Sequence, residues 1–243
     1  MAATTRPKKT ALLVAQRIVE DINRRGNQVG DRLPPEKIML EDYDVGRGTL
    51  RESLRFLELQ GVIILRPGPS GGPIVQQPDS SGLATSLSLL LQFQKAPFKT
   101  VIETRAALEP PMARLAAERM SEAGVTELFE IVDLEKRNLD DHAAFLSQTR
   151  RFHTTIAEGS GNTIFASMFI ALFDILDGAA VGVEYPPEQR RLTVDIQTSI
   201  ATAIAERDPD RADELMTTHM RALAGYTKKH YADALAAPVI WKM

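Results

Sequence analysis

The chain has 243 residues, of which 44% are hydrophobic and 25% charged, enough for about two domains. It has no cysteine, no apolar run approaching the roughly 18–20 residues of a membrane span, and no secretory signal after MAATTRPKKT, so we expect a cytoplasmic protein without disulfides or thiolate chemistry. The formal net charge of −3 is uneven: residues 1–76 hold 12 Lys and Arg against 9 Asp and Glu, whereas residues 77–243 hold 17 against 23. The basic N-terminal part favours a polyanionic partner.

The first 76 residues predict three helices followed by a hairpin. TALLVAQRIVEDINRRG has helical apolar spacing and ends at Gly26, and PPEKIMLEDY predicts a short second helix. A third helix is predicted from about 47 to 60, before Gly61. VIILRPG and GPIV are short β-branched runs around a Gly/Pro turn, which is typical of a two-stranded hairpin. This order predicts a winged helix-turn-helix over residues 1–76.

The rest of the chain predicts a mainly α protein. RPGPSGGPIVQQPDSSG is broken by Pro, Gly and Ser, so we expect a linker at 77–82 and a second domain over 83–243. There the apolar spacing is helical throughout and predicts a bundle of six or seven helices, over 83–95, 98–120, 122–139, 142–158, 162–179, 187–206 and 209–235. Pro110 and Pro111 are expected to bend or interrupt the second of these helices.

The predicted third helix has two chemically different faces. Its inner face carries Leu50, Leu54 and Leu57. Its outer face carries Arg47, Thr49, Arg51 and Arg55. Arginine near the start of such a helix can bind guanine or phosphate in the major groove. The alternative is a solvated amphipathic helix whose arginines pair with Glu52 or Glu58.

LPPEKIMLEDYDVGRGTLRESLRFLELQGVIILRPGPSGGPIV resembles the DNA-binding domain of GntR-family transcriptional regulators. The resemblance implies that operator DNA is contacted by the recognition helix, the preceding helix and the wing, through Lys37, Arg47, Thr49, Arg51, Arg66 and Gly68. Two positions depart from the family pattern. Pro35 replaces a helix-capping serine that contacts phosphate, and Gly48 replaces a polar residue, which implies an altered operator preference.

Three later stretches resemble the ligand-sensing domain of the FadR subfamily, known as the FCD type: VIETRAALEPPMARLAAERM, RRFHTTIAEGSGN and ATAIAERDPDRADELMTTHM. The resemblance implies an antiparallel all-α bundle around one effector cavity, and a homodimer. Many members bind a divalent metal there through an aspartate, a histidine four residues later, and two further histidines. The corresponding positions in this chain are Thr149, His153, Gln197 and His219. Because Thr149 and Gln197 are poor metal ligands, His153 and His219 are the only candidates, and we expect no required metal.

The same positions predict an effector site. Arg105, Thr149, His153, Gln197 and His219 would form a polar cluster inside an apolar bundle, suited to a carboxylate or an acyl compound. The alternative is purely structural: Arg105 pairs with Glu109, and the two histidines are hydrogen-bonded core residues. His142 and His230 match no motif and are expected at the surface. The tail APVIWKM is either disordered or packed on the bundle or a partner subunit.

Together these features predict a transcriptional regulator, more specifically a repressor, that is not an enzyme. It would bind a palindromic operator in double-stranded DNA as a homodimer, under control of a small-molecule effector and without membrane contact. The alternative is a helical metal-binding module or enzyme that carries a DNA-binding-like domain. We disfavour it because the sequence offers no convincing nucleophile and a depleted metal set.

Overall fold

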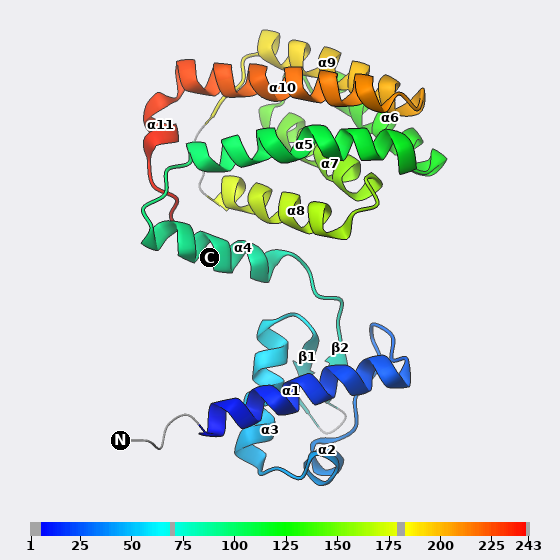
Figure 1. Ribbon diagram of the computed structural model, residues 1–243, viewed down its shortest axis with the longest axis vertical. Coiled ribbons are helices and arrows are strands. Elements are labelled where there is room, and N and C mark those ends of the chain that lie inside the picture. Colours follow the sequence, from blue (N-terminus) through cyan, green and yellow to red (C-terminus); the bar gives the residue numbers. More distant parts are fainter. Residues whose placement is uncertain (1–5, 69–70, 179–182, 242–243) are drawn as a thin grey trace. The chain divides into compact units, whose positions relative to one another are not determined.

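The computed structural model describes residues 6–68, 71–178 and 183–241, without the side chains of residues 6–8, 177 and 178. The chain divides into two compact units, Met1–Gly82 and Leu83–Met243. Figure 1 shows three helices and a hairpin in the first unit and helices alone in the second. The predicted fold class, a winged helix-turn-helix plus an all-helical domain, is confirmed. Among the described residues, no helix is both long enough and apolar enough to cross a membrane.

The N-terminal unit contains α1 (Arg6–Arg25), α2 (Glu36–Tyr43), α3 (Arg47–Leu59), β1 (Ile63–Arg66) and β2 (Gly72–Val75). Its core is formed by buried apolar residues from all five elements, including Ile18, Met39, Leu50, Leu54, Leu57, Ile63 and Val75. One buried polar contact fixes α3 on α1, because the Ser53 hydroxyl donates to the carbonyl of Ala11 at 2.8 Å. Removing these apolar side chains from water is what positions α3 with its arginines outside.

The wing is a regular antiparallel hairpin in which Ile63 pairs with Val75 and Arg66 with Gly72. Glu58 of α3 holds it to that helix, since its Oε1 accepts from the Leu65 backbone N–H at 2.9 Å. Gly71 is required sterically, because a Cβ at this position would lie 2.1 Å from the Arg66 carbonyl oxygen. The sequence Pro-Gly-Pro-Ser-Gly-Gly thus permits a turn that side chains at residue 71 would block.

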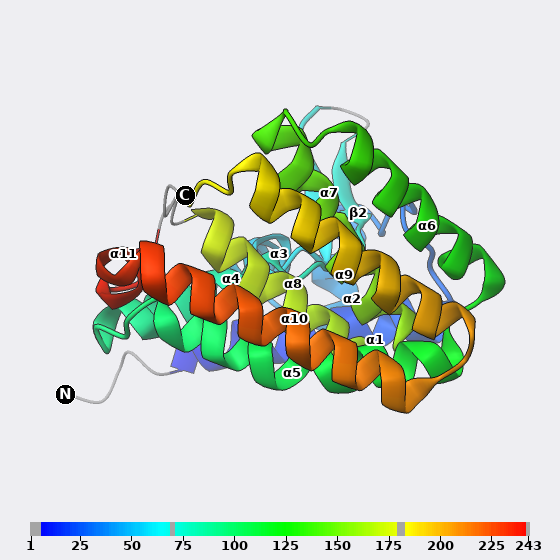
Figure 2. The ribbon, with the colours of Figure 1, turned by 90° about the horizontal axis from the view of Figure 1, so that it is seen from above.

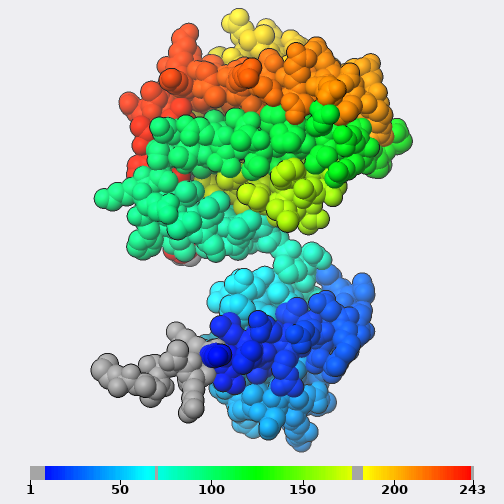
Figure 3. All heavy atoms as spheres, in the orientation of Figure 1, coloured from blue at the N-terminus to red at the C-terminus, as the bar shows by residue number. Residues whose placement is uncertain are grey.

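The C-terminal unit is built from α4 (Ser81–Phe93), α5 (Lys99–Arg119), α6 (Glu122–Arg137), α7 (His142–Gly159), α8 (Thr163–Gly178), α9 (Pro187–Ala205), α10 (Pro209–His230) and α11 (Ala232–Ala236). Helices α5 and α10 lie side by side along one face, as Figures 1 and 3 show. Seen from above in Figure 2, α9 runs beside α10 with α6 on its other side. The core between them is rich in Ala and Phe, including Ala113, Phe145, Phe152, Phe169 and Ala201.

Three details differ from the sequence predictions. Helix α4 begins at Ser81, inside the predicted linker 77–82. The predicted helix 209–235 is divided at Tyr231 into α10 and α11, which makes eight helices among the described residues of this unit. Pro110 and Pro111 do not interrupt α5, which continues to Arg119. The prolines remove two backbone donors, but α5 is packed along α10 and its residues around them are buried, so tertiary contacts outweigh the local penalty.

The C-terminal tail packs on its own bundle as far as residue 241. Val239 is buried with Phe98, Val101, Leu172 and Ile175. Its backbone N–H donates to the Ala96 carbonyl at 2.9 Å, and that of Trp241 donates to Gln92 Oε1 at 2.7 Å. Of the possibilities left open for the tail, which were disorder and packing on the bundle or on a partner subunit, the structure shows packing on the bundle up to residue 241.

Candidate functional site

The N-terminal unit presents a cationic face on α3. Arg47, Arg51 and Arg55 are exposed and Thr49 is half-buried, while the leucines on the opposite side of the helix are buried. Lys37 on α2 is also exposed. The predicted division of this helix into an apolar inner face and a polar outer face is therefore present in the structure.

Arg51 is paired, but not with the residues that the sequence suggested. Its Nε donates to Glu36 Oε1 of α2 at 3.0 Å, across an exposed pair. An exposed ion pair contributes little stability. The pair instead orients the Arg51 side chain. The Glu36 carboxylate binds Nε, and this side chain makes no other hydrogen bond within the described part of the chain. The terminal nitrogens of the guanidinium thus remain available for a base or a phosphate.

The predicted wing residues lie at the end of the hairpin. Arg66 is the last residue of β1 and is exposed. Gly68 is exposed with a φ of +103°, a conformation that favours glycine. Residues 69 and 70, at the tip, lie outside the described residues. Both predicted wing residues therefore sit beside the turn.

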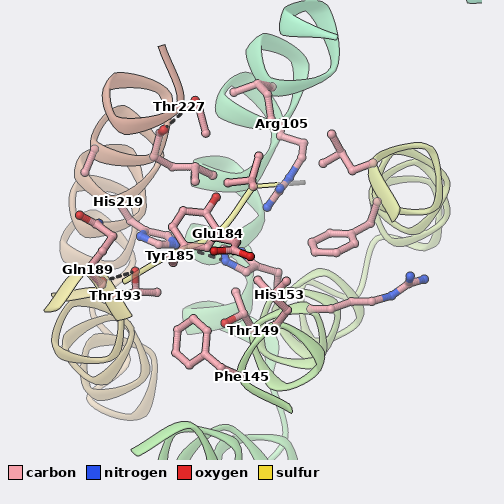
Figure 4. A pocket seen from close by; sticks show the side chains of 18 of the residues that line it. Arg105, Phe145, Thr149, His153, Glu184, Tyr185, Gln189, Thr193, His219 and Thr227 are labelled. Carbon is pink, nitrogen blue, oxygen red and sulfur yellow. Dashed lines mark hydrogen bonds between the residues drawn. The ribbon is translucent and has the colours of Figure 1, made fainter. Parts of the chain in front are cut away.

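The C-terminal unit contains a cavity of about 950 Å³. Four of the five predicted effector residues line it: Arg105, Thr149, His153 and His219. Figure 4 shows their side chains entering from α5, α7 and α10, with Tyr185 entering from the segment before α9. The fifth, Gln197, is fully buried on α9 and does not line the cavity. Most of the remaining wall is apolar, from residues such as Phe98, Ile102, Phe145, Phe173, Leu176 and Ile196.

Four buried polar residues form a continuous chain beside the cavity, and three of them, Arg105, His153 and His219, line it. Arg105 Nε donates to Glu109 Oε1 at 2.6 Å. Glu109 Oε2 lies 2.5 Å from His153 Nδ1. His153 Nε2 in turn lies 3.3 Å from His219 Nε2. The contacts expected for the structural alternative are thus present, and they form part of the wall of a large cavity.

The charges in this chain are strongly coupled. Burial alone would raise the pKa of Glu109, but the Arg105 and His153 side chains outweigh it and lower that pKa to about 2. Burial lowers the pKa of His219 to about 3, and the neighbouring His153 acts in the same direction. At neutral pH this chain therefore holds an anionic Glu109 behind the wall, with a cationic Arg105 and an uncharged His219 lining it.

A second buried carboxylate engages the remaining two predicted residues. Thr149 donates to Glu135 Oε1 at 2.8 Å. The Gln197 amide nitrogen, in the orientation that satisfies both groups, donates to the same oxygen at 2.8 Å and also to Oε2. Glu135 is fully buried on α6, so three helices meet at this group. Its carboxylate explains why a threonine and a glutamine occupy these positions.

These contacts do not fit the metal that the family resemblance implies. The Thr149 hydroxyl and the Gln197 amide are directed to Glu135, and Glu109 is already engaged by Arg105 and His153. Across the described ranges, no three His, Cys, Asp or Glu side chains are arranged to hold an ion. Two imidazoles are fewer than the three or so donors that a zinc-type site needs.

Glu135 is expected to make stability depend on pH. Burial raises its pKa to about 7, although the Thr149 hydroxyl acts in the opposite direction. In the unfolded chain the group ionises near pH 4.5, so between about pH 4.5 and 7 the native state binds more protons, and this contribution to stability falls as pH rises. Glu135→Gln removes the titration. The melting temperature of this variant minus that of the wild type should increase from pH 4.5 to 8, by the equivalent of about 1–3 kcal/mol in the free energy of unfolding. A difference that stays constant over this range would contradict the assignment.

Three residues of the cavity region were missed from the sequence. Tyr185 and His142 line the cavity, and His142 is half-buried at the start of α7 instead of fully exposed as expected. Burial, with Arg190 nearby, lowers its pKa. Glu135 was not singled out because its partners come from two other helices. No local sequence pattern marks such residues, since only the tertiary fold brings them together.

Comparison with known families covers most of the chain. Residues 10–70 match the model of the bacterial regulatory proteins of the gntR family. Residues 100–222 match the model of the FCD domain. The first match contains the exposed arginine face, and the second contains most of the residues that line the cavity.

Similar proteins extend over both modules. The HTH-type transcriptional repressor NanR of Klebsiella aerogenes is 30% identical over 222 residues, which is 89% of this chain and 85% of that protein. The protein of the same name from Cronobacter sakazakii is 28% identical over 221 residues, 89% of this chain and 84% of its own length. Among solved structures, Streptococcus agalactiae GntR covers 88% of this chain and 99% of its own, with 26% identity and a TM-score of 0.66.

Proposed function

Because the chain belongs to the GntR family of bacterial regulatory proteins and carries an FCD domain, we propose that it is a transcriptional repressor whose release from operator DNA is controlled by a small organic effector. GntR-type regulators bind operator DNA and sense small molecules, and they are not enzymes. The alternative of a metal-binding module or enzyme with a DNA-binding-like domain is therefore set aside. We further propose that the protein belongs to the FadR subfamily, because the motifs of its C-terminal domain resemble those of that subfamily.

The observation that carries the DNA-binding part is the exposed row of arginines on α3. Arg47, Arg51 and Thr49 would contact the major groove, with Lys37 on the neighbouring helix and Arg66 and Gly68 on the wing. Four of these residues, Lys37, Arg47, Arg51 and Arg66, are exposed cations, which suits contact with phosphates and base edges. The modest positive charge of residues 1–76 is consistent with sequence-specific contacts more than with bulk electrostatic attraction.

We propose that the protein acts as a homodimer on a palindromic operator. A single winged helix reads only a few base pairs, and two copies related by a twofold axis would read two half-sites. Helix α4 supports self-association, since it carries no charged residue and exposes Leu83, Leu90 and Phe93. Operator DNA lies in the cytoplasm, so this localisation is part of the proposal.

The effector would bind in the cavity of the second unit. We propose that this unit, residues 83–243, is the effector-binding and dimerisation domain, and that residues 77–82 join it to the DNA-binding domain. The cavity volume of about 950 Å³ accommodates a small organic molecule. Among the described residues that line the cavity, Arg105 is the one buried cation. Thr149, His153 and His219 would supply further polar contacts, with Gln197 behind them. A carboxylate or an acyl compound suits this combination of a guanidinium and apolar walls.

The test is a fluorescence anisotropy titration of the full chain with a labelled duplex from upstream of its own gene. Specific binding should exceed binding to a shuffled duplex of equal length by at least about 1,000-fold at physiological salt. Light scattering of the complex should give two chains per duplex. Equal affinity for the two duplexes would refute the repressor function.

A further inference from the structure

Two side chains at the cavity, Arg105 and Tyr185, carry donors that make no hydrogen bond within the described part of the chain. Arg105 is 5% exposed, and only its Nε is hydrogen-bonded, to Glu109. Its guanidinium lies over the rings of Phe169 and Phe173, 5.5 and 4.8 Å from their centroids. Within the described part of the chain, neither terminal nitrogen of Arg105 and no hydrogen of the Tyr185 hydroxyl has a hydrogen-bond partner. Donors that line the cavity and have no protein partner favour a bound acceptor there.

The backbone of Tyr185 is held from three sides, although its hydroxyl is not. Its N–H donates to His142 Nε2 at 3.3 Å, and its carbonyl accepts from Arg190 Nε at 2.6 Å. The preceding residue, Glu184, is fixed by Tyr226 and Tyr231, whose hydroxyls donate to its carbonyl at 3.2 and 2.8 Å. The ring of Tyr185 is thus placed at the cavity by contacts that leave its own polar group free.

Tyr185 and Arg105 are directed to the same part of the cavity. Figure 4 shows both side chains pointing to the region where His153 and His219 also converge. The charge of Arg105 is close enough to act on the ionisation of Tyr185, while burial raises the pKa of that phenol to about 12. Tyr185 therefore stays protonated at neutral pH, so its O–H can donate a hydrogen bond to a bound anion.

Resting on the proposed effector function, we propose that Arg105 and Tyr185 together bind the head group of an organic carboxylate directly, without a metal ion, while the apolar wall holds its hydrocarbon part. The Arg105 guanidinium and the Tyr185 hydroxyl, directed to the same region of the cavity (Figure 4), would together replace the cation that a metal would supply. Thr149 and Gln197 are committed to Glu135, so the positions that would complete a metal site serve the core instead. Arg105 then distinguishes an acid from its neutral amide, and Tyr185 is a further binding residue whose hydrogen bond is stronger to the anion.

The experiment is isothermal titration of the full chain with octanoate and with octanamide, which share a chain and differ in head-group charge. Octanoate should bind at least about ten-fold more tightly than octanamide, with the same affinity in EDTA and in added Zn²⁺. Tyr185→Phe should weaken octanoate binding by about 10-fold, the usual value for a lost hydrogen bond to a charged group, and should weaken octanamide binding by less, since a hydrogen bond to a neutral amide is weaker. Arg105→Met should remove the preference for the acid.

Tyr43→Phe is the matched control. It also removes one tyrosine hydroxyl, but Tyr43 lies in the N-terminal unit, where this hydroxyl donates to Asp21 at 3.0 Å, so octanoate affinity should stay within about two-fold of wild type. The proposal is overturned if octanoate fails to bind, if EDTA abolishes its binding, or if the two tyrosine variants lose affinity equally. These results do not depend on DNA, so failure of the wild-type chain to bind its operator would count against the repressor function alone.

Discussion

Arg51→Ala should weaken operator binding by roughly 10- to 100-fold for each recognition helix engaged, the effect of losing one arginine contact to a guanine edge. Arg51 is exposed near the start of α3, and Glu36 engages its Nε at 3.0 Å while leaving the terminal nitrogens for DNA. Anisotropy titrations with the operator and with a shuffled duplex would measure the effect. The preference for the operator should shrink together with the affinity, since a base contact carries sequence information.

The matched control is Arg24→Ala. Arg24 is also an exposed arginine of the N-terminal unit, but it lies in the last turn of α1 and pairs with Asp21 of the same helix. This variant loses the same charge, so it reports the non-specific electrostatic part of the affinity, expected to be about three-fold or less. Equal losses in the two variants would mean that Arg51 contributes charge alone. An unchanged affinity in Arg51→Ala would remove this face of α3 from the binding site.

The N-terminal unit could be predicted well because its signals are local. The spacing of Leu50, Leu54 and Leu57 fixes which side of α3 is buried, and all three side chains are. Glycine and proline mark the turn of the wing for steric reasons that a sequence displays directly, as the close approach at Gly71 illustrates. The pairing of Arg51 with Glu36 could not be predicted in this way, because it depends on how α2 packs against α3.

The cavity could be predicted only in part. Arg105, His153 and His219 were identified through family motifs, and they do meet at one wall. Glu135 and Tyr185 could not be found, because each acquires its role from partners on other helices. A buried carboxylate and a tyrosine in a connecting segment have no distinctive sequence spacing. The same limit explains why α5 continues through two prolines, since packing against α10 overrides a correct local rule.

Glu109→Gln should destabilise the C-terminal unit by about 3–5 kcal/mol, because it leaves the buried Arg105 without its counter-charge. For a unit of this size the melting temperature should fall by roughly 6–20 °C. Glu122→Gln is the control: Glu122 pairs with Arg207 at the surface with its side chain 89% exposed, so its loss should change stability by less than about 0.5 kcal/mol. Similar melting temperatures for the two variants would show that the buried pair is not needed for stability.

The pH dependence of stability provides a second, independent test of the ion pair between Glu109 and Arg105. The pKa of Glu109 is lowered to about 2 from 4.5, so its stabilising contribution is complete above about pH 4.5 and is lost as the pH falls towards 2. The gap in melting temperature between the wild type and Glu109→Gln should therefore be constant from pH 8 to 5 and narrow below pH 4.5. A gap that widens in acid would contradict the ion pair.

A double replacement separates the structural role of this pair from its role in effector binding. When both members of a buried ion pair become apolar, the cost of desolvating them disappears, and stability is often retained. Arg105→Met with Glu109→Leu should therefore melt within a few degrees of the wild type and above Glu109→Gln. It should nevertheless fail to prefer octanoate over octanamide, because the guanidinium that faces the cavity is gone. A stable double variant that still selects the acid would assign Arg105 to the core alone and leave the anion to other side chains.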